Sequence, residues 1–288
     1  MIWNLGSINI DNFYEVPHLP RAGETLAARS YGFGLGGKGA NMSVAAARAA
    51  ARVSHIGAVG DDGRWTRERM MEYGVDIPHV ARIEAPTGHA NIVIDPQGEN
   101  SIVLFHGANV ELTEAIIGGA LTEASPGDYL LMQNETNGQE YAATTAQALG
   151  LRVVYAAAPF EAAAIARLSG KINLLVLNEV EAEQLEVATG KAAGALGIDD
   201  VVITLGAQGC KWVSNTSEKH FDAYPADVVD TTGAGDTFTG YLVAGLDRGM
   251  DMETSIDLAL KAASLMVARR GTADVIPDLK EIQDQFGA

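Results

Sequence analysis

The chain has 288 residues, a hydrophobic content of 47% and a formal net charge of −17 at pH 7. This length suits one α/β domain with a small appendage, and the apolar content suffices for a large core. The acidic balance argues against a surface that tracks the phosphates of a nucleic acid. With a single cysteine, Cys210, no internal disulfide forms, and its place after an apolar stretch predicts a structural thiol.

The N-terminal stretch 1–6 lacks a basic region followed by a long apolar run, so we do not expect a signal peptide there. No stretch of the sequence is both long enough and apolar enough to predict a membrane-spanning helix. We therefore expect a cytoplasmic protein whose charge keeps it in solution.

A short apolar strand is predicted over 2–9, and it ends in the polar motif Gly-Ser-Ile-Asn-Ile-Asp at 6–11. Strands of α/β sheets often deliver such polar residues to a ligand site, which makes Asn9 and Asp11 candidates. The alternative is that both side chains only make hydrogen bonds within a turn. Proline and glycine interrupt the pattern over 13–33, which predicts a small β excursion outside the core.

The glycine cluster Gly-Gly-Lys-Gly-Ala-Asn at 36–41 opens a predicted helix. Its glycines leave room for a ligand against bare backbone, while Lys38 and Asn41 offer hydrogen-bond donors. The spacing is not that of a Walker A loop. A purely structural turn is the alternative. Farther along, 89–95 and 101–105 flank a turn-forming segment, which predicts a hairpin that joins the first excursion in a four- or five-stranded small sheet.

After position 109 the pattern alternates between helices and strands, which is typical of parallel βαβ units with helices on both faces of the sheet. The predicted helices are 113–122, 138–149, 160–168 and 179–187, and the predicted strands are 128–132, 151–155, 173–177 and 200–205. Glu135 and Asn178 follow two of these strands, where ligands bind. Asn178 and Glu181 could form a helix N-cap with an acidic first turn, or orient a hydrated Mg²⁺.

A hairpin is predicted over 210–224, and helices are predicted at 234–247, 253–268 and 278–286. The first of these helices follows a second glycine turn, Asp-Thr-Thr-Gly-Ala-Gly-Asp at 230–236. Free amides and the helix dipole at such a turn attract phosphate. Asp236 could cap the helix, or it could take a proton from a hydroxyl that attacks a phosphoryl group held there.

Four motifs together give the chain a resemblance to the ribokinase-like, or PfkB, carbohydrate kinase family over essentially its whole length. Three of these motifs are those described above at residues 6–11, 36–41 and 230–236, and the fourth is Asn-x-x-Glu at residues 178–181. The resemblance implies one α/β domain over 1–288, doubly wound around a mostly parallel central sheet with helices on both faces. It also implies a small β-sheet lid formed by about 10–35 and 88–106, and a homodimer assembled through the lid.

The resemblance further implies a role for each candidate residue. Asp236 would deprotonate and contact the sugar hydroxyl, while Gly233, Ala234 and Gly235 would form an anion hole for the γ-phosphoryl group of ATP. The residues implied for the sugar are Asn9, Asp11, Gly37, Lys38, Asn41 and Glu135. Those implied for the nucleotide are Asn178, Thr204, Gly206 and Gly209, with Glu181 near a hydrated Mg²⁺.

A K⁺ site beside the anion hole is implied as well. Its ligands would come from Asp230, Thr232, Met266, Arg269 and Gly271. The sequence departs from its relatives at Val275, where a serine is common, and at 155–159, where an Asn-Pro-Ala-Pro-like segment is common.

The leading hypothesis is an ATP-dependent kinase of ribose or a similar pentose. A kinase of a nucleoside or of another sugar or sugar acid is the first alternative, and Tyr14, Phe33 and Phe105 are the aromatic residues that could line a nucleobase pocket. The second alternative, a sugar-binding regulator without catalysis, conflicts with the intact turn at 230–236.

Overall fold

The computed structural model describes residues 1–287. Its main sheet has nine strands in the order β13-β12-β11-β10-β9-β8-β1-β4-β5. These strands are β1 (Ile2–Leu5), β4 (Val53–Val59), β5 (Val80–Arg82), β8 (Tyr129–Met132), β9 (Arg152–Ala156), β10 (Leu174–Asn178), β11 (Asp200–Thr204), β12 (Cys210–Ser214) and β13 (Glu218–Phe221). The strands from β5 to β11 pair in parallel, and β12 and β13 add an antiparallel edge.

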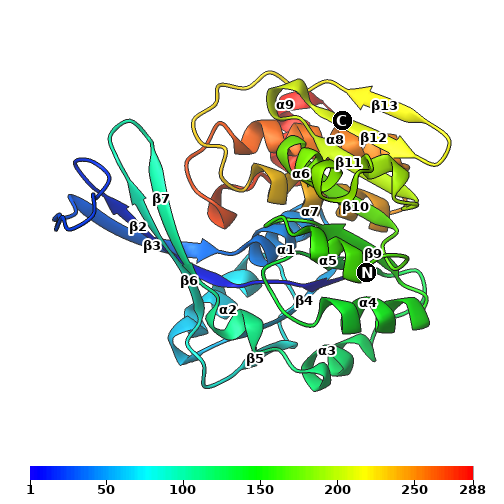
Figure 1. The fold of residues 1–288 in the computed structure, drawn as a ribbon, viewed down its shortest axis with the longest axis horizontal. Helices are drawn as coiled ribbons and strands as arrows, with labels where there is room; N and C mark the ends of the chain where they lie inside the picture. Colours follow the sequence, from blue (N-terminus) through cyan, green and yellow to red (C-terminus); the bar gives the residue numbers. More distant parts are fainter. Residues whose placement is uncertain (288) are drawn as a thin grey trace.

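Helices cover both faces of this sheet (Figure 1). One face packs against α1 (Lys38–Arg48), α2 (Arg64–Glu72), α7 (Ala234–Asp247), α8 (Met252–Met266) and α9 (Leu279–Phe286). The other packs against α3 (Glu114–Leu121), α4 (Gln139–Ala148), α5 (Ala162–Arg167) and α6 (Glu179–Thr189). Buried strand residues alternate between the two cores, as Ile2 and Trp3 do. The predicted doubly wound α/β fold is therefore confirmed.

A separate four-stranded sheet, in the order β3-β2-β6-β7, projects from one side of the main body (Figure 1). Its strands are β2 (Asn9–Glu15), β3 (Ser30–Gly36), β6 (Gly88–Ile94) and β7 (Asn100–Phe105). The predicted small sheet is confirmed, but the single strand expected over 2–9 is wrong. The chain leaves the main sheet after Leu5 and enters the small sheet at Asn9, because the intervening backbone pairs elsewhere: the Ser7 carbonyl accepts a hydrogen bond from the Ala40 amide.

Five short 3₁₀ helices complete the elements of the described residues: η1 (Asp61–Gly63), η2 (Gly107–Val110), η3 (Ala193–Ala195), η4 (Gly206–Gln208) and η5 (Ala273–Val275). Cys210 is buried and unpaired, as predicted for a structural thiol. Up to residue 287, the structure has no helix with the length and apolar character that crossing a membrane requires.

Helices α1 and α7 approach closely, and a glycine makes this possible. A Cβ atom on Gly240 of α7 would lie 2.5 Å from the Cβ of Ala45 and 2.6 Å from the carbonyl oxygen of Met42, both on α1. Since each helix begins at one of the two glycine turns, this contact fixes the turns relative to each other.

Gly240→Ala is therefore expected to destabilise the fold by roughly 1–3 kcal/mol, because the backbone of α1 must move to admit the methyl group. Gly119→Ala on α3 is the matched control, since an added Cβ there meets no atom within 4 Å. That change should stabilise the protein by up to about 1 kcal/mol through helix propensity. Urea unfolding of both variants measures the difference, and equal effects would contradict the packing argument.

Candidate active site

The two glycine turns, far apart in the chain, meet at one site. The Nδ2 atom of Asn41 donates a hydrogen bond of 2.9 Å to Oδ2 of Asp236, across 195 positions of sequence. Both side chains are buried, with 5% and 7% of their surface exposed. Asn41 and Asp236, both of which the resemblance implies for the sugar, are therefore neighbours in the structure.

Glycine is required in both turns by the backbone conformation, and in the first turn also by the space that a side chain needs. Gly37 and Gly233 precede α1 and α7 with φ angles of 92° and 74°, in the left-handed region that favours glycine. At Gly36, an added Cβ would lie 1.9 Å from Oδ2 of Asp11, so the bare backbone there makes space for this carboxylate. The first turn thus admits the Asp11 carboxylate against its main chain.

Lys38 lies among the carboxylates of Asp11, Glu135, Glu181 and Asp236. The charge of Asp236 is the largest influence on Lys38 and raises the pKa of its ammonium group, against the opposing effect of burial. Burial first, and then the charges of Glu135 and Asp236, raise the pKa of Asp11 to about 7. Burial likewise raises the pKa of Glu181. The Lys38 ammonium group is thus the counter-ion of several carboxylates that are largely shielded from water.

Glu135 is held by groups from two other parts of the chain. Its Oε2 atom accepts hydrogen bonds from the Ser7 hydroxyl at 2.5 Å and from the Lys38 amide at 3.0 Å. The Ser7 oxygen also accepts a bond from the Gly39 amide. Sequence reasoning missed Ser7 as a site residue, although it belongs to the 6–11 motif.

Asn9 and Asp11 lie two positions apart on β2 and so share one face of the small sheet. The Oδ1 atom of Asn9 accepts a hydrogen bond from Nδ2 of Asn109, whose own Oδ1 accepts one from the Ile8 amide. Asn109 was also missed, because it comes from a 3₁₀ turn 100 positions away and the sequence carries no signal for it. This bond orients Asn9 beside Asp11.

An unpaired acceptor marks where a ligand can bind. The Oδ1 atom of Asn41 is buried and has no hydrogen-bond partner among the described residues, although its Nδ2 is bound to Asp236. A buried polar atom without a partner is costly, and a hydroxyl group of a ligand would satisfy it.

The residues predicted for the nucleotide lie at the carboxyl ends of two neighbouring parallel strands. Asn178 of β10 pairs in register with Thr204 of β11. Asn178 and Glu181 form a capping box at the start of α6, which confirms the interpretation of Asn178 as a helix N-cap. Gly206 and Gly209 follow β11 with φ angles of 57° and 90°. A Cβ on Gly209 would lie 1.9 Å from the Phe221 carbonyl oxygen, so close packing alone explains why a glycine stands at this position.

The loop predicted to hold a cation lies against the end of α8. The amides of Val229 and Asp230 both donate to the Val267 carbonyl, and Oδ1 of Asp230 accepts from the Thr232 amide at 2.9 Å. Within residues 1–287, no group of three or more His, Cys, Asp or Glu side chains is arranged to hold a metal ion.

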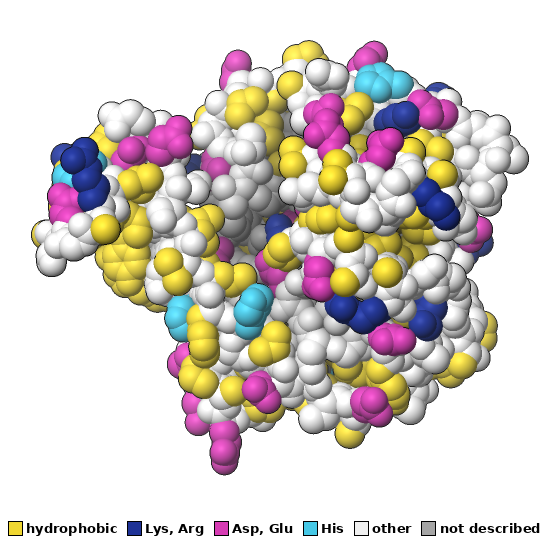
Figure 2. All heavy atoms as spheres, in the orientation of Figure 1, with side chains coloured by type: hydrophobic (Ala, Val, Ile, Leu, Met, Phe, Trp, Pro, Cys, Tyr) yellow, Lys and Arg dark blue, Asp and Glu magenta, His cyan; other side chains and the backbone are white. Residues whose placement is uncertain are grey.

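The surface is hollowed between the small sheet and the main body, and acidic and basic side chains gather at the floor of this hollow (Figure 2). Strand ends of the main sheet, the two glycine turns and one face of the small sheet therefore surround one space. In an open α/β sheet this is where ligands bind.

Known proteins share this architecture. A model of the pfkB family of carbohydrate kinases matches residues 1–279. The ribokinase of Haemophilus influenzae is 36% identical over 292 residues, covering 96% of this chain and 95% of that protein. The ribokinase of Cryptococcus neoformans var. grubii in complex with ADP superimposes with a TM-score of 0.86 at 31% identity, over 99% of both chains. For Arabidopsis thaliana ribokinase complexed with ribose and ATP, the TM-score is 0.85 at 28% identity, over 98% of this chain and 97% of that one.

The raised pKa of Asp11 predicts a pH-dependent stability. Its folded-state pKa is about 7 against an ordinary value of 3.8, so folding binds a proton between these values and stability falls as pH rises through that range. Asp11→Asn removes this loss and should raise the free energy of unfolding by roughly 1–4 kcal/mol at pH 8 but not at pH 4. Urea unfolding at both pH values tests this.

Asp284→Asn, at an exposed position on α9, is the control and should leave the pH profile unchanged. An Asp11→Asn variant that loses as much stability as the parent protein between pH 4 and pH 8 would show that Asp11 does not cause the pH dependence.

Proposed function

Since the chain belongs to the pfkB family of carbohydrate kinases, we propose that it transfers the γ-phosphoryl group of ATP to a hydroxyl of ribose or a similar pentose. The observation that carries this proposal is the contact of Asn41 with Asp236. It places a carboxylate at the first turn of α7, where free amides attract a phosphoryl group.

In this proposal Asp236 is the general base. Its carboxylate accepts the proton of the attacking sugar hydroxyl, the sugar oxygen bonds to the γ-phosphorus, and the bond to the bridging oxygen of ADP breaks. The Asn41 amide fixes one carboxylate oxygen and leaves the other free for the substrate. Charge on the transferring group is stabilised by Gly233, Ala234 and Gly235. The Ala234 amide also donates a hydrogen bond to the Thr231 carbonyl, at the long N–O distance of 3.2 Å.

The sugar lies between the small sheet and α1. A carboxylate accepts hydrogen bonds from two neighbouring hydroxyls at once, which suits Asp11 and Glu135 to a vicinal diol. The unpaired Oδ1 of Asn41 accepts a further hydroxyl. Asn9, Gly37 and Lys38 complete the set. The small sheet, with its connections at about 10–35 and 88–106, acts as a lid that excludes water from the reacting groups.

ATP binds along the strand ends that carry Asn178, Thr204, Gly206 and Gly209. The capping box uses only Oε2 of Glu181, which leaves Oε1 for a water ligand of Mg²⁺. A single carboxylate together with phosphates and waters is a common Mg²⁺ environment in proteins. When bound, the ion neutralises charge on the phosphates.

A K⁺ site is proposed where the 230–232 loop meets the end of α8. The Asp230 carboxylate and the carbonyls of Thr232, Met266, Arg269 and Gly271 are hard oxygen donors, and the hydrogen bonds to Val267 hold the two segments together. Bound there, the cation would favour the arrangement of the adjacent turn at 230–236. Turnover that is indifferent to replacing K⁺ by tetramethylammonium would remove this part of the proposal.

The nucleoside alternative gains no support from the aromatic residues it relied on. By strand register, Tyr14, Phe33 and Phe105 share the face of the small sheet that points away from Asp11. They therefore do not line the space where the sugar binds.

Asp236→Asn is expected to lower kcat for ribose by roughly 10²–10⁴-fold while leaving the fold intact, because the amide cannot accept the hydroxyl proton. ADP release with a panel of pentoses, other sugars and nucleosides measures this, with Asp284→Asn as the control. Near-full activity of Asp236→Asn would contradict the assigned base. Turnover of nucleosides but of no pentose would favour the alternative substrate.

The same outward face of the small sheet supports the proposed homodimer. Tyr31, Phe33, Val103 and Phe105 lie on it with 58%, 59%, 66% and 47% of their surface exposed. Hydrophobic side chains gather there in the space-filling view (Figure 2). An apolar patch of this kind on a folded protein marks an interaction surface, and a second copy offers a self-complementary one.

Val103→Glu should therefore shift the protein from dimer to monomer in size-exclusion chromatography with light scattering, because each interface would bury two unpaired charges. Val187→Glu on α6 is the matched control, since Val187 is 88% exposed and lies outside the small sheet. An unchanged mass for Val103→Glu would contradict assembly through this face.

A further inference from the structure

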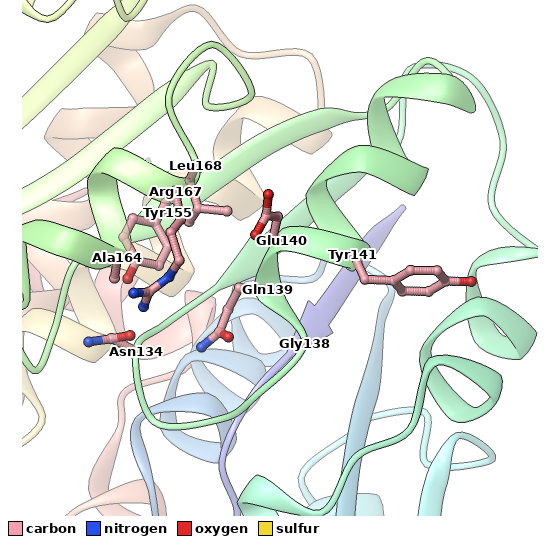
Figure 3. A pocket seen from close by; sticks show the side chains of 9 residues that line it. All are labelled: Asn134, Gly138, Gln139, Glu140, Tyr141, Tyr155, Ala164, Arg167 and Leu168. Atoms are coloured by element: carbon pink, nitrogen blue, oxygen red, sulfur yellow. The ribbon is translucent and has the colours of Figure 1, made fainter.

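A second cavity lies outside the candidate active site, beside the start of α4 and the end of α5. It has a volume of about 170 Å³. Its lining includes Asn134, Gly138, Gln139, Glu140, Tyr155 and Arg167 (Figure 3). The proposed phosphoryl transfer uses none of these residues.

Tyr155 is the group that the fold does not explain. Its side chain is 0% exposed, and its hydroxyl has no hydrogen-bond partner among the described residues. Burial raises the pKa of this hydroxyl, so it stays protonated and able to donate. In Figure 3 the hydroxyl points toward the guanidinium of Arg167 and the amide of Asn134. A buried donor without a partner is costly, and a ligand in the cavity would supply the acceptor.

The other donors at this cavity favour a negative ligand. Helix α4 begins at Gln139 after Gly138, which has a φ of 79° and no side chain to cap the first amides. Because the first residues of α4 line the cavity, the positive end of the helix dipole faces it. Arg167 contributes a planar cation whose only ion pair among the described residues, with Glu161, is exposed and 3.6 Å long. Glu140 is the acidic group at the cavity, and its Oε1 atom pairs with Nζ of Lys171 at 3.7 Å.

We propose that this cavity binds a small oxyanion, a phosphate or a carboxylate, through the Tyr155 hydroxyl, the Arg167 guanidinium and the first amides of α4. The volume admits a group of this size and excludes a nucleotide.

The cavity connects to the candidate active site through the loop 133–138. Gln139 donates from Nε2 to the carbonyls of Gln133 and Thr136, and Asn134 donates to the Pro159 carbonyl. Between these braces the same loop carries Glu135, which contacts Ser7 and Lys38. An oxyanion that orders the start of α4 would therefore steady Glu135. This consequence for the sugar rests on the proposed function, whereas binding of the anion does not.

The test measures the thermal unfolding midpoint of the full chain against inorganic phosphate and, separately, against pyruvate, with ionic strength held constant by chloride. Tyr155→Phe removes only the unpaired hydroxyl, so without anion its stability should equal or exceed that of the parent. Arg167→Gln removes the cation. Both variants should weaken the apparent affinity for the preferred anion at least roughly tenfold. The stronger of the two anions identifies the phosphate or carboxylate class.

Tyr141→Phe is the matched control. Tyr141 stands on α4 at the edge of the cavity, but its ring points away from the cavity (Figure 3), and its hydroxyl lies toward Gly118 of α3. Anion binding at the turn of α7 would persist in all three variants and so is distinguishable from the proposed site. Stabilisation that is equal in the parent, Tyr155→Phe and Arg167→Gln would overturn the proposal, as would no stabilisation by either anion. In a kinase assay, loss of an anion effect on the KM for the sugar in both variants would support the link to Glu135.

Discussion

The hydrogen bond between Asn41 and Asp236 is the interaction on which the rest of the site depends. It joins the first turns of two helices that begin at glycine turns, and the close contact at Gly240 keeps those helices in register. A shift of one helix past the other would separate the proposed base from the sugar side of the pocket. The energetic cost of a buried carboxylate is offset here by a donor that the fold holds in place.

A second constraint is the concentration of acidic groups around Lys38. Asp11, Glu135 and Asp236 are all nearly inaccessible to water, and their mutual repulsion contributes to the raised pKa of Asp11. Such an arrangement costs stability in the absence of ligand and is typical of functional sites. Hydroxyl groups of a sugar would donate hydrogen bonds to these carboxylates, so the same groups that cost stability would favour a bound polyol.

The sequence predicted the features that are local or periodic. The βαβ alternation gave the doubly wound sheet, and the motifs at 36–41 and 230–236 placed Asn41 and Asp236 at helix starts. It did not reveal Asn109 or Tyr155, because the role of each comes from tertiary neighbours: Asn109 orients Asn9 from another element, and the Tyr155 hydroxyl is conspicuous only because nothing pairs with it. The break between β1 and β2 was missed because both segments are extended and only three residues, 6–8, separate them.

The most direct test of the central claim is a double-mutant cycle of Asn41→Ala and Asp236→Asn, measured as kcat/KM for ribose. If Asn41 acts by positioning Asp236, its loss should be costly in the parent protein and nearly without effect once the carboxylate is gone, so that the two changes are strongly non-additive. Additive effects would mean that the two residues act independently, and would contradict the claim that Asn41 positions Asp236 for phosphoryl transfer.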